Sequence, residues 1–151
     1  MIEFIQSQDN VKLFDGGNHI DDRGEICFVN TVPINDFKRF YTISNKSVDV
    51  IRAWQAHKLE RKAFHVVQGV FLIATVKLDD FDNPSDDLDV LKFKLDAKSA
   101  QILMIPPGYA NGIRALSENN KLLVFSTMNL KDSSADTFRF PCSKWFDWRS
   151  K

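Results

Sequence analysis

The chain has 151 residues, of which 44% are hydrophobic and 12% aromatic. This length is typical of one domain, and the composition excludes a largely disordered chain. Lysine plus arginine and aspartate plus glutamate number 20 each, so the net charge provides no basic surface for nucleic acid or for an anionic membrane.

Cysteine usage and the distribution of apolar residues indicate the compartment. Cys27 and Cys142 lie far apart and lack metal-ligand spacing, so we expect free thiols, with one long-range disulfide as the alternative. No apolar run reaches the roughly 18 residues of a membrane span, and the first residues do not resemble a signal peptide. A cytoplasmic protein is therefore expected.

In the N-terminal half, short strands are predicted between turn signals. The first 20 residues are mixed, with a turn signal at Gly16–Asn18. Gly69 interrupts a long apolar run and predicts a turn or bulge between two strands. The predicted strands, rich in aromatic and β-branched residues, follow the charged turn at 21–24 and cover 37–45, 47–54 and 63–78.

The C-terminal half continues the same pattern. Residues 79–89 form an acidic loop, and strands are predicted over 90–95, 101–116 and 121–130, the second broken at Pro106–Gly108. The tail from Asp132 is aromatic and has room for a short helix. Its Trp and Phe residues either form a partner surface or cover a barrel end or dimer seam.

Strands recur roughly every 8 to 15 residues, and no amphipathic helix longer than three turns is present. This spacing predicts an all-β antiparallel sandwich or barrel. Such a fold offers its interior and its mouth as places for a binding site.

One candidate site is the segment RAWQAHK, in which Arg52, Gln55 and His57 are concentrated in six residues. Alternation along the following strand places Lys62 and His65 on opposite faces. A strand lysine most often lies on the solvated face, and a lone histidine such as His65 is most often packed or at the surface.

A second candidate is the segment IPPGYANGI, residues 105–113. Its prolines and glycine fix a rigid turn, which presents Tyr109 and Asn111 from the strand that follows. The alternative is a tight corner without a functional role.

Four segments follow one another along the chain. Asp22–Gly24 form a DxRG turn, and Lys38, Arg39 and Tyr41 match a KRxYxI segment. Residues 52–58 are similar to RGxHAHK, and 105–116 are similar to IPPGFAHGFxxL. In this order the segments resemble the RmlC-like cupins, which include the dTDP-4-keto-6-deoxyhexose 3,5-epimerases and the dTDP-4-keto-6-deoxyglucose 3,4-ketoisomerases, and the likeness spans about residues 20–128.

The resemblance implies a single jelly-roll cupin domain over residues 1–151, a homodimer without a cofactor, and a dTDP-linked keto sugar as ligand. It implies enolisation of that sugar by a sugar-nucleotide isomerase or epimerase of deoxysugar or polysaccharide biosynthesis. The implied roles are acid/base catalysis by His57, enediolate stabilisation by Lys62 and Arg52, orientation by Gln55 and Asn111, diphosphate binding by Arg23 and Arg39, and stacking or closure by Tyr41 or Tyr109.

The chain also departs from the family pattern. Gln55 and Asn111 stand where the family has histidines, and the epimerases' tyrosine near residues 125–128 is missing. Neither amide can transfer a proton near neutral pH, so a catalytically degenerate cupin that binds a sugar nucleotide or a partner enzyme is the alternative. A third interpretation places the base at His65 or Glu60. The same changes speak against a metal site.

Overall fold

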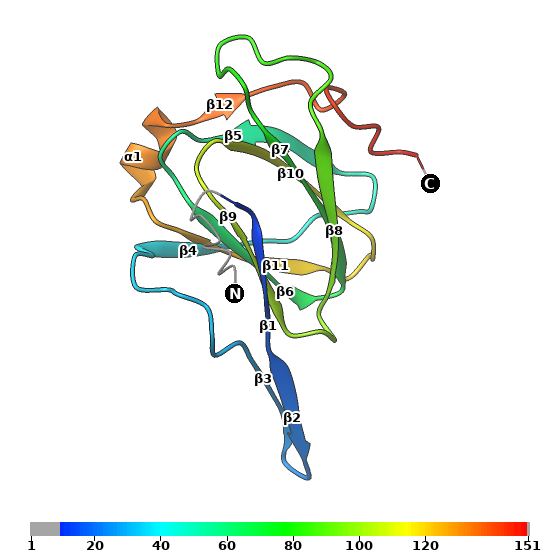
Figure 1. Cartoon of the computed structure of the whole chain (residues 1–151). Helices are drawn as coiled ribbons and strands as arrows, with labels where there is room; N and C mark the ends of the chain where they lie inside the picture. The colour runs from blue at the N-terminus through cyan, green and yellow to red at the C-terminus, as the bar shows by residue number, and fades with distance from the viewer. Residues whose placement is uncertain (1–9, 151) are drawn as a thin grey trace, which may run out of the picture.

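A computed structural model describes residues 10–150 and contains two five-stranded antiparallel sheets that face each other (Figure 1). The first sheet consists of β1 (Lys12–Asp15), β9 (Gln101–Ile105), β6 (Lys62–Gln68), β11 (Lys121–Ser126) and β4 (Arg39–Ile43), in that order. The second consists of β12 (Phe138–Arg139), β5 (Ile51–Ala56), β10 (Tyr109–Ala115), β7 (Val70–Lys77) and β8 (Val90–Asp96). The all-β expectation is confirmed.

The centre of the second sheet is buried on both faces, as β7 illustrates. Its residues Phe71 and Ile73 contribute to the core between the sheets, whereas Ala74 and Val76 pack under the C-terminal tail. A strand that is covered on both sides has no solvated face to fill with polar residues, which explains the continuous apolar run in the sequence.

The aromatic tail packs on the outer face of this second sheet, and not on a barrel end as one interpretation expected. Trp148 is buried against Trp54, with ring centroids 5.4 Å apart. A Cβ atom on Gly112 would lie 2.4 Å from the Trp148 ring, so glycine is required for this close approach. The tail therefore belongs to the hydrophobic core of this chain.

Several local predictions are confirmed. Gly69 has a φ of +77° and connects β6 to β7, and the segment Pro106–Gly108 separates β9 from β10. Both cysteines are free. The predicted strand over 121–130 is wrong at its end, because β11 stops at Ser126.

The helix α1 (Leu130–Ala135) follows instead, with Asn129 as its N-cap. The side-chain oxygen of Asn129 accepts a hydrogen bond from the Asp132 amide at 2.9 Å. This six-residue helix is too short to show an amphipathic period. None of the helices within residues 10–150 has the length and hydropathy of a membrane span.

Sequence analysis missed β1 and placed a turn signal where β2 (Gly17–Asp21) begins. β2 pairs with β3 (Gly24–Phe28) through the expected charged turn. This two-stranded ribbon extends away from both sheets (Figure 1).

Candidate functional site

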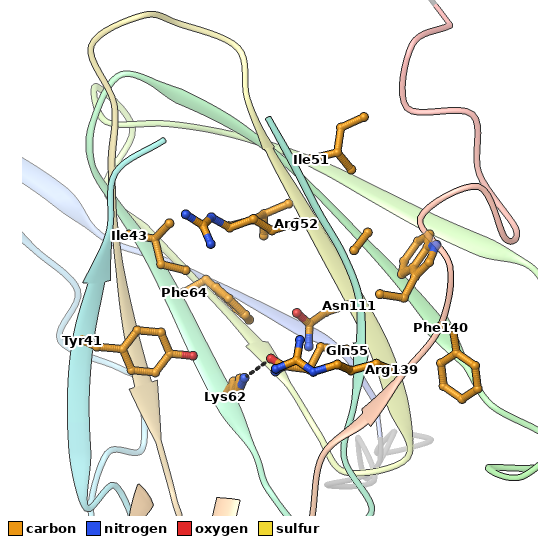
Figure 2. A pocket seen from close by; sticks show the side chains of 13 residues that line it. Tyr41, Ile43, Ile51, Arg52, Gln55, Lys62, Phe64, Asn111, Arg139 and Phe140 are labelled. Carbon is orange, nitrogen blue, oxygen red and sulfur yellow. Dashed lines mark hydrogen bonds between the residues drawn. The ribbon is translucent and has the colours of Figure 1, made fainter. Parts of the chain in front are cut away.

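A cavity of about 590 Å³ opens between the two sheets, where β4 faces β5, β10 and β12 (Figure 2). Phe64 and Ile113, which also belong to the core, form its apolar part. Its polar lining consists of Tyr41, Arg52, Gln55, Lys62, Asn111 and Arg139. Residues from the candidate segments at 52–58 and 105–113 thus meet in one place.

A bulge in β5 brings Arg52 and Gln55 into the same cavity. In a regular strand, residues three apart lie on opposite faces. On β10, Asn111 pairs with Gln55, but Ile113 pairs with Arg52, so β5 carries one extra residue at this point. The bulge turns both side chains toward the space between the sheets.

Lys62 lies on the inner face of β6 and is only 4% exposed, so the usual solvated position does not apply. Its Nζ donates a hydrogen bond to Gln55 Oε1 at 3.0 Å. Burial lowers the pKa of Lys62 to about 8, with Arg39 and Arg139 adding to the effect and Glu60 opposing it. Near neutral pH this amine can therefore both accept and donate a proton.

Tyr41 faces Lys62 from β4, with the ammonium nitrogen 6.0 Å from the ring centroid. Burial, aided by the charge of Glu60, raises the pKa of Tyr41 to about 12. The Arg39 guanidinium lies 5.1 Å from the same ring centroid. Tyr41 is therefore a neutral phenol that can donate a hydrogen bond to a ligand.

A second cavity of about 470 Å³ adjoins the first and shares Tyr41, Gln55, Lys62 and Arg139 with it. Arg39, Thr137 and three residues of α1 form the rest of its lining. Two compartments that meet at Lys62 suit a ligand with two chemically different parts.

Glu60 is buried two residues before Lys62 and holds several elements together. Its carboxylate accepts hydrogen bonds from Ser126 and Ser133 and lies 3.5 Å from the Arg39 guanidinium. Burial alone raises the pKa of Glu60, but hydrogen bonds from His57 and Ser126 and the charge of Lys62 outweigh it and lower the pKa to about 2. Glu60 is thus a structural anion and a poor base.

His57 is buried and lines neither cavity. Its Nδ1 lies 3.0 Å from the Asp136 carbonyl oxygen and 3.0 Å from Glu60 Oε2. Both neighbours are acceptors, so Nδ1 carries the hydrogen. Nε2 has no hydrogen-bond partner within residues 10–150. His57 therefore lies outside the cavity that Lys62 and Arg52, the other two residues of the expected catalytic set, both line.

Three further candidates lie elsewhere. Arg23 is at the turn of the β2–β3 ribbon, where it pairs with Asp21 at 2.6 Å. Tyr109 packs in the core between the sheets. His65 lies on the outer side of β6, with Nδ1 2.9 Å from the Gln101 carbonyl oxygen.

Sequence reasoning missed Arg139. It lies within the aromatic tail, and only the pairing of β12 with β5 brings it opposite Gln55. No short-range pattern in the sequence marks this pairing.

Within residues 10–150, no three His, Cys, Asp or Glu side chains are grouped so that they could hold a metal ion.

No protein-family model and no curated protein matches the sequence. Among solved structures, a dTDP-4-dehydrorhamnose 3,5-epimerase from Bacillus anthracis with TDP and PPi bound has a TM-score of 0.76 at 17% identity, over 96% of this chain and 88% of that chain. A 3,4-ketoisomerase from Helicobacter canadensis has a TM-score of 0.67 at 19% identity, over 87% of this chain and 91% of that chain.

A sugar 3,4-ketoisomerase from Thermoanaerobacterium thermosaccharolyticum in complex with TDP also has a TM-score of 0.67, at 21% identity, over 87% of this chain and 88% of that chain. At these identities the likeness establishes the fold. The chain has the RmlC-like cupin jelly-roll fold.

Proposed function

We propose that this protein binds a dTDP-linked 4-keto-6-deoxyhexose between its sheets and enolises it, as an isomerase or epimerase of deoxysugar biosynthesis. The observation that carries the proposal is Lys62, a buried amine with a pKa of about 8 in a cavity lined by Tyr41, Gln55 and arginines. Solved neighbours with this fold include complexes with TDP and with TDP-4-keto-6-deoxyglucose.

Enolisation needs a base beside the carbon next to the carbonyl and a positive or hydrogen-bonding environment around the oxygen. In the proposed step, the neutral amine of Lys62 takes the proton. The C–H electron pair then forms the C=C bond, and the carbonyl oxygen becomes an enolate. The Tyr41 hydroxyl and the Arg52 guanidinium stabilise this oxygen, and the Lys62 ammonium returns the proton to carbon.

This proposal transfers the acid/base role from His57 to Lys62, because His57 lines neither cavity. The amides of Gln55 and Asn111 orient the sugar hydroxyls, and Gln55 also fixes the position of the Lys62 nitrogen. At pH 7 on the order of a tenth of an amine with this pKa is neutral, which is enough for turnover.

Proton NMR of dTDP-4-keto-6-deoxyglucose in heavy water, with and without the protein, tests the proposal. We expect loss of the signal from a proton beside the carbonyl, or the appearance of a new keto sugar. Lys62→Met should abolish this exchange, and Lys121→Met, on an exposed strand lysine, should leave it unchanged. Line broadening without exchange would instead favour the non-catalytic alternative, which the amides at Gln55 and Asn111 also suit.

We also propose that the protein is a homodimer whose β2–β3 ribbons each pack on the second copy. Ile20 and Ile26 are 72% and 59% exposed. They lie on opposite faces of the ribbon, because Ile20 pairs with Glu25 and Ile26 with His19. An isolated two-stranded ribbon is marginally stable in water, and a second copy would cover these residues.

A further inference from the structure

Arg139 differs from the other cations of the two cavities. Arg39 faces Glu60, the Arg52 Nε donates to Asn45 at 2.7 Å, and Lys62 donates to Gln55. Within residues 10–150, the Arg139 side chain has neither a hydrogen bond nor an ion pair, although it lines both cavities. Figure 2 shows its guanidinium directed toward Gln55 and Lys62.

The positive charge of the two cavities is not balanced by their linings. Arg39, Arg52, Lys62 and Arg139 all contribute to the linings, whereas no Asp or Glu does. Glu60 is the nearby anion, and it is buried and already bonded to two serines. The charges of Arg39 and Arg139 both lower the pKa of Lys62, so these cations repel one another, and an anionic ligand at the junction of the cavities would relieve the repulsion.

We propose that Arg139 is a ligand-binding residue, which holds a phosphate group of the nucleotide sugar at the junction of the two cavities. A guanidinium forms paired hydrogen bonds with phosphate oxygens, which an ammonium cannot do in the same geometry. The phosphate group lies between Arg39 and Arg139, and the sugar lies in the larger cavity against Lys62. The inference rests on the proposed function for the identity of the ligand, but phosphate binding is measurable without turnover.

Hydrogen bonds of the Asp136 carboxylate, called the anchor below, fix the C-terminal segment that carries Arg139. The Asp136 carboxylate accepts hydrogen bonds from the backbone amides of Lys58, Leu59 and Glu60 at 3.1, 2.9 and 2.9 Å. Three residues later, Arg139 pairs with Gln55 on β5. The anchor thus fixes a two-residue strand that would be too short to hold its position alone.

Isothermal titration calorimetry with TDP and with inorganic pyrophosphate tests this proposal on the wild type, Arg139→Gln and Arg139→Lys. We expect Arg139→Gln to weaken TDP binding by tenfold or more, and Arg139→Lys to weaken it less. Arg149→Gln, an exposed tail arginine outside both cavities, is the matched control and should bind TDP as the wild type does. Salt should weaken TDP binding less in Arg139→Gln than in the wild type.

Equal TDP affinity of the wild type and Arg139→Gln would overturn the proposal, as would a wild type that binds neither probe. The heavy-water experiment reports separately on turnover. TDP binding that depends on Arg139, without proton exchange in the keto sugar, would therefore reject enolisation and retain this assignment.

Discussion

The buried charge of Lys62 lowers the free energy of unfolding, and the same burial makes its amine a suitable base for the proposed enolisation. Its pKa in the folded protein is about 8, below the ordinary value of 10.5. Below pH 8 the lysine is therefore charged both in the folded and in the unfolded chain, and folding must desolvate that charge. This unfavourable contribution disappears as the pH rises from about 8 to 10.5.

Replacing Lys62 with methionine should thus remove activity and raise stability. The side chain is of similar length, and a neutral group in this position avoids the desolvation cost. We expect the variant to lose proton exchange in the keto sugar. Its melting temperature at pH 7 should equal or exceed that of the wild type, by about 2–4 °C for each kcal/mol gained in the free energy of unfolding. A large fall in melting temperature would show that Lys62 has a structural role.

The pH dependence of exchange tests the assignment of Lys62 as the base. The neutral amine is the reactive form, so kcat/KM for exchange should rise with pH, with a midpoint near 8, and then level off. The charges that act on Lys62 are Glu60, Arg39 and Arg139. Because Arg139 lowers this pKa, Arg139→Gln should move the midpoint to higher pH. A midpoint that stays unchanged in this variant would contradict the placement of Arg139 beside Lys62.

At the residue scale, the sequence identified Lys62, Arg52, Gln55 and Asn111 as site candidates, and the structure brings all four to one cavity. The role of His57 could not be judged from the sequence, because its ring contacts Glu60 and also Asp136, the C-cap residue of α1, which is distant in the sequence. Burial also determines the pKa of Lys62, which no local pattern reveals.

The C-terminal strand β12 pairs with β5 and forms the edge of the second sheet, and α1 lines the second cavity. The connection depends on Asp136, which accepts three backbone hydrogen bonds from the β5–β6 loop. Each buried amide that loses its acceptor costs about 1–3 kcal/mol. The position of Arg139 is therefore coupled to the stability of this loop.

Asp136→Ala should accordingly reduce the free energy of unfolding by at least about 1–3 kcal/mol and weaken TDP binding, although Asp136 lines neither cavity. Urea denaturation followed by Trp fluorescence, together with calorimetry, measures both effects. Asp132→Ala on the exposed side of α1 is the control and should change each by little. If Asp136→Ala lowers stability but leaves the TDP affinity unchanged, the Asp136 hydrogen bonds stabilise the fold without positioning Arg139 for binding.

At the element scale, strand predictions succeeded where Gly or Pro marks the ends, as at Gly69 and at Pro106–Gly108. They missed β1, which has four residues, and they extended the strand at 121–130 to the first residue of α1, a six-residue helix for which the sequence left room. Elements this short have no measurable periodicity, and pairing with distant partners such as β9 determines them. The bulge in β5 likewise depends on its register with β10.

At the scale of the whole molecule, the regularly spaced strands made an all-β sandwich or barrel predictable, and the resemblance to the RmlC-like cupins implied the jelly roll. The β2–β3 ribbon, however, is unexplained by the fold of one chain. It contacts neither five-stranded sheet through strand pairing, and it exposes an isoleucine on each face. A two-stranded ribbon is marginally stable in water, and in the proposed homodimer the second copy would cover its exposed isoleucines.

The double substitution Ile20→Lys and Ile26→Lys should convert the proposed homodimer to a monomer. Two lysines in place of the exposed isoleucines would have to be desolvated in the interface, whereas in the monomer they would remain solvated. Sedimentation equilibrium should give a mass of twice 17.4 kDa for the wild type and 17.4 kDa for the double variant. Asp22→Lys, at the exposed turn of the same ribbon, should remain dimeric if burial of the isoleucines and not net charge drives association. A monomeric wild type would reject the homodimer, and a dimeric double variant would place the interface on another surface.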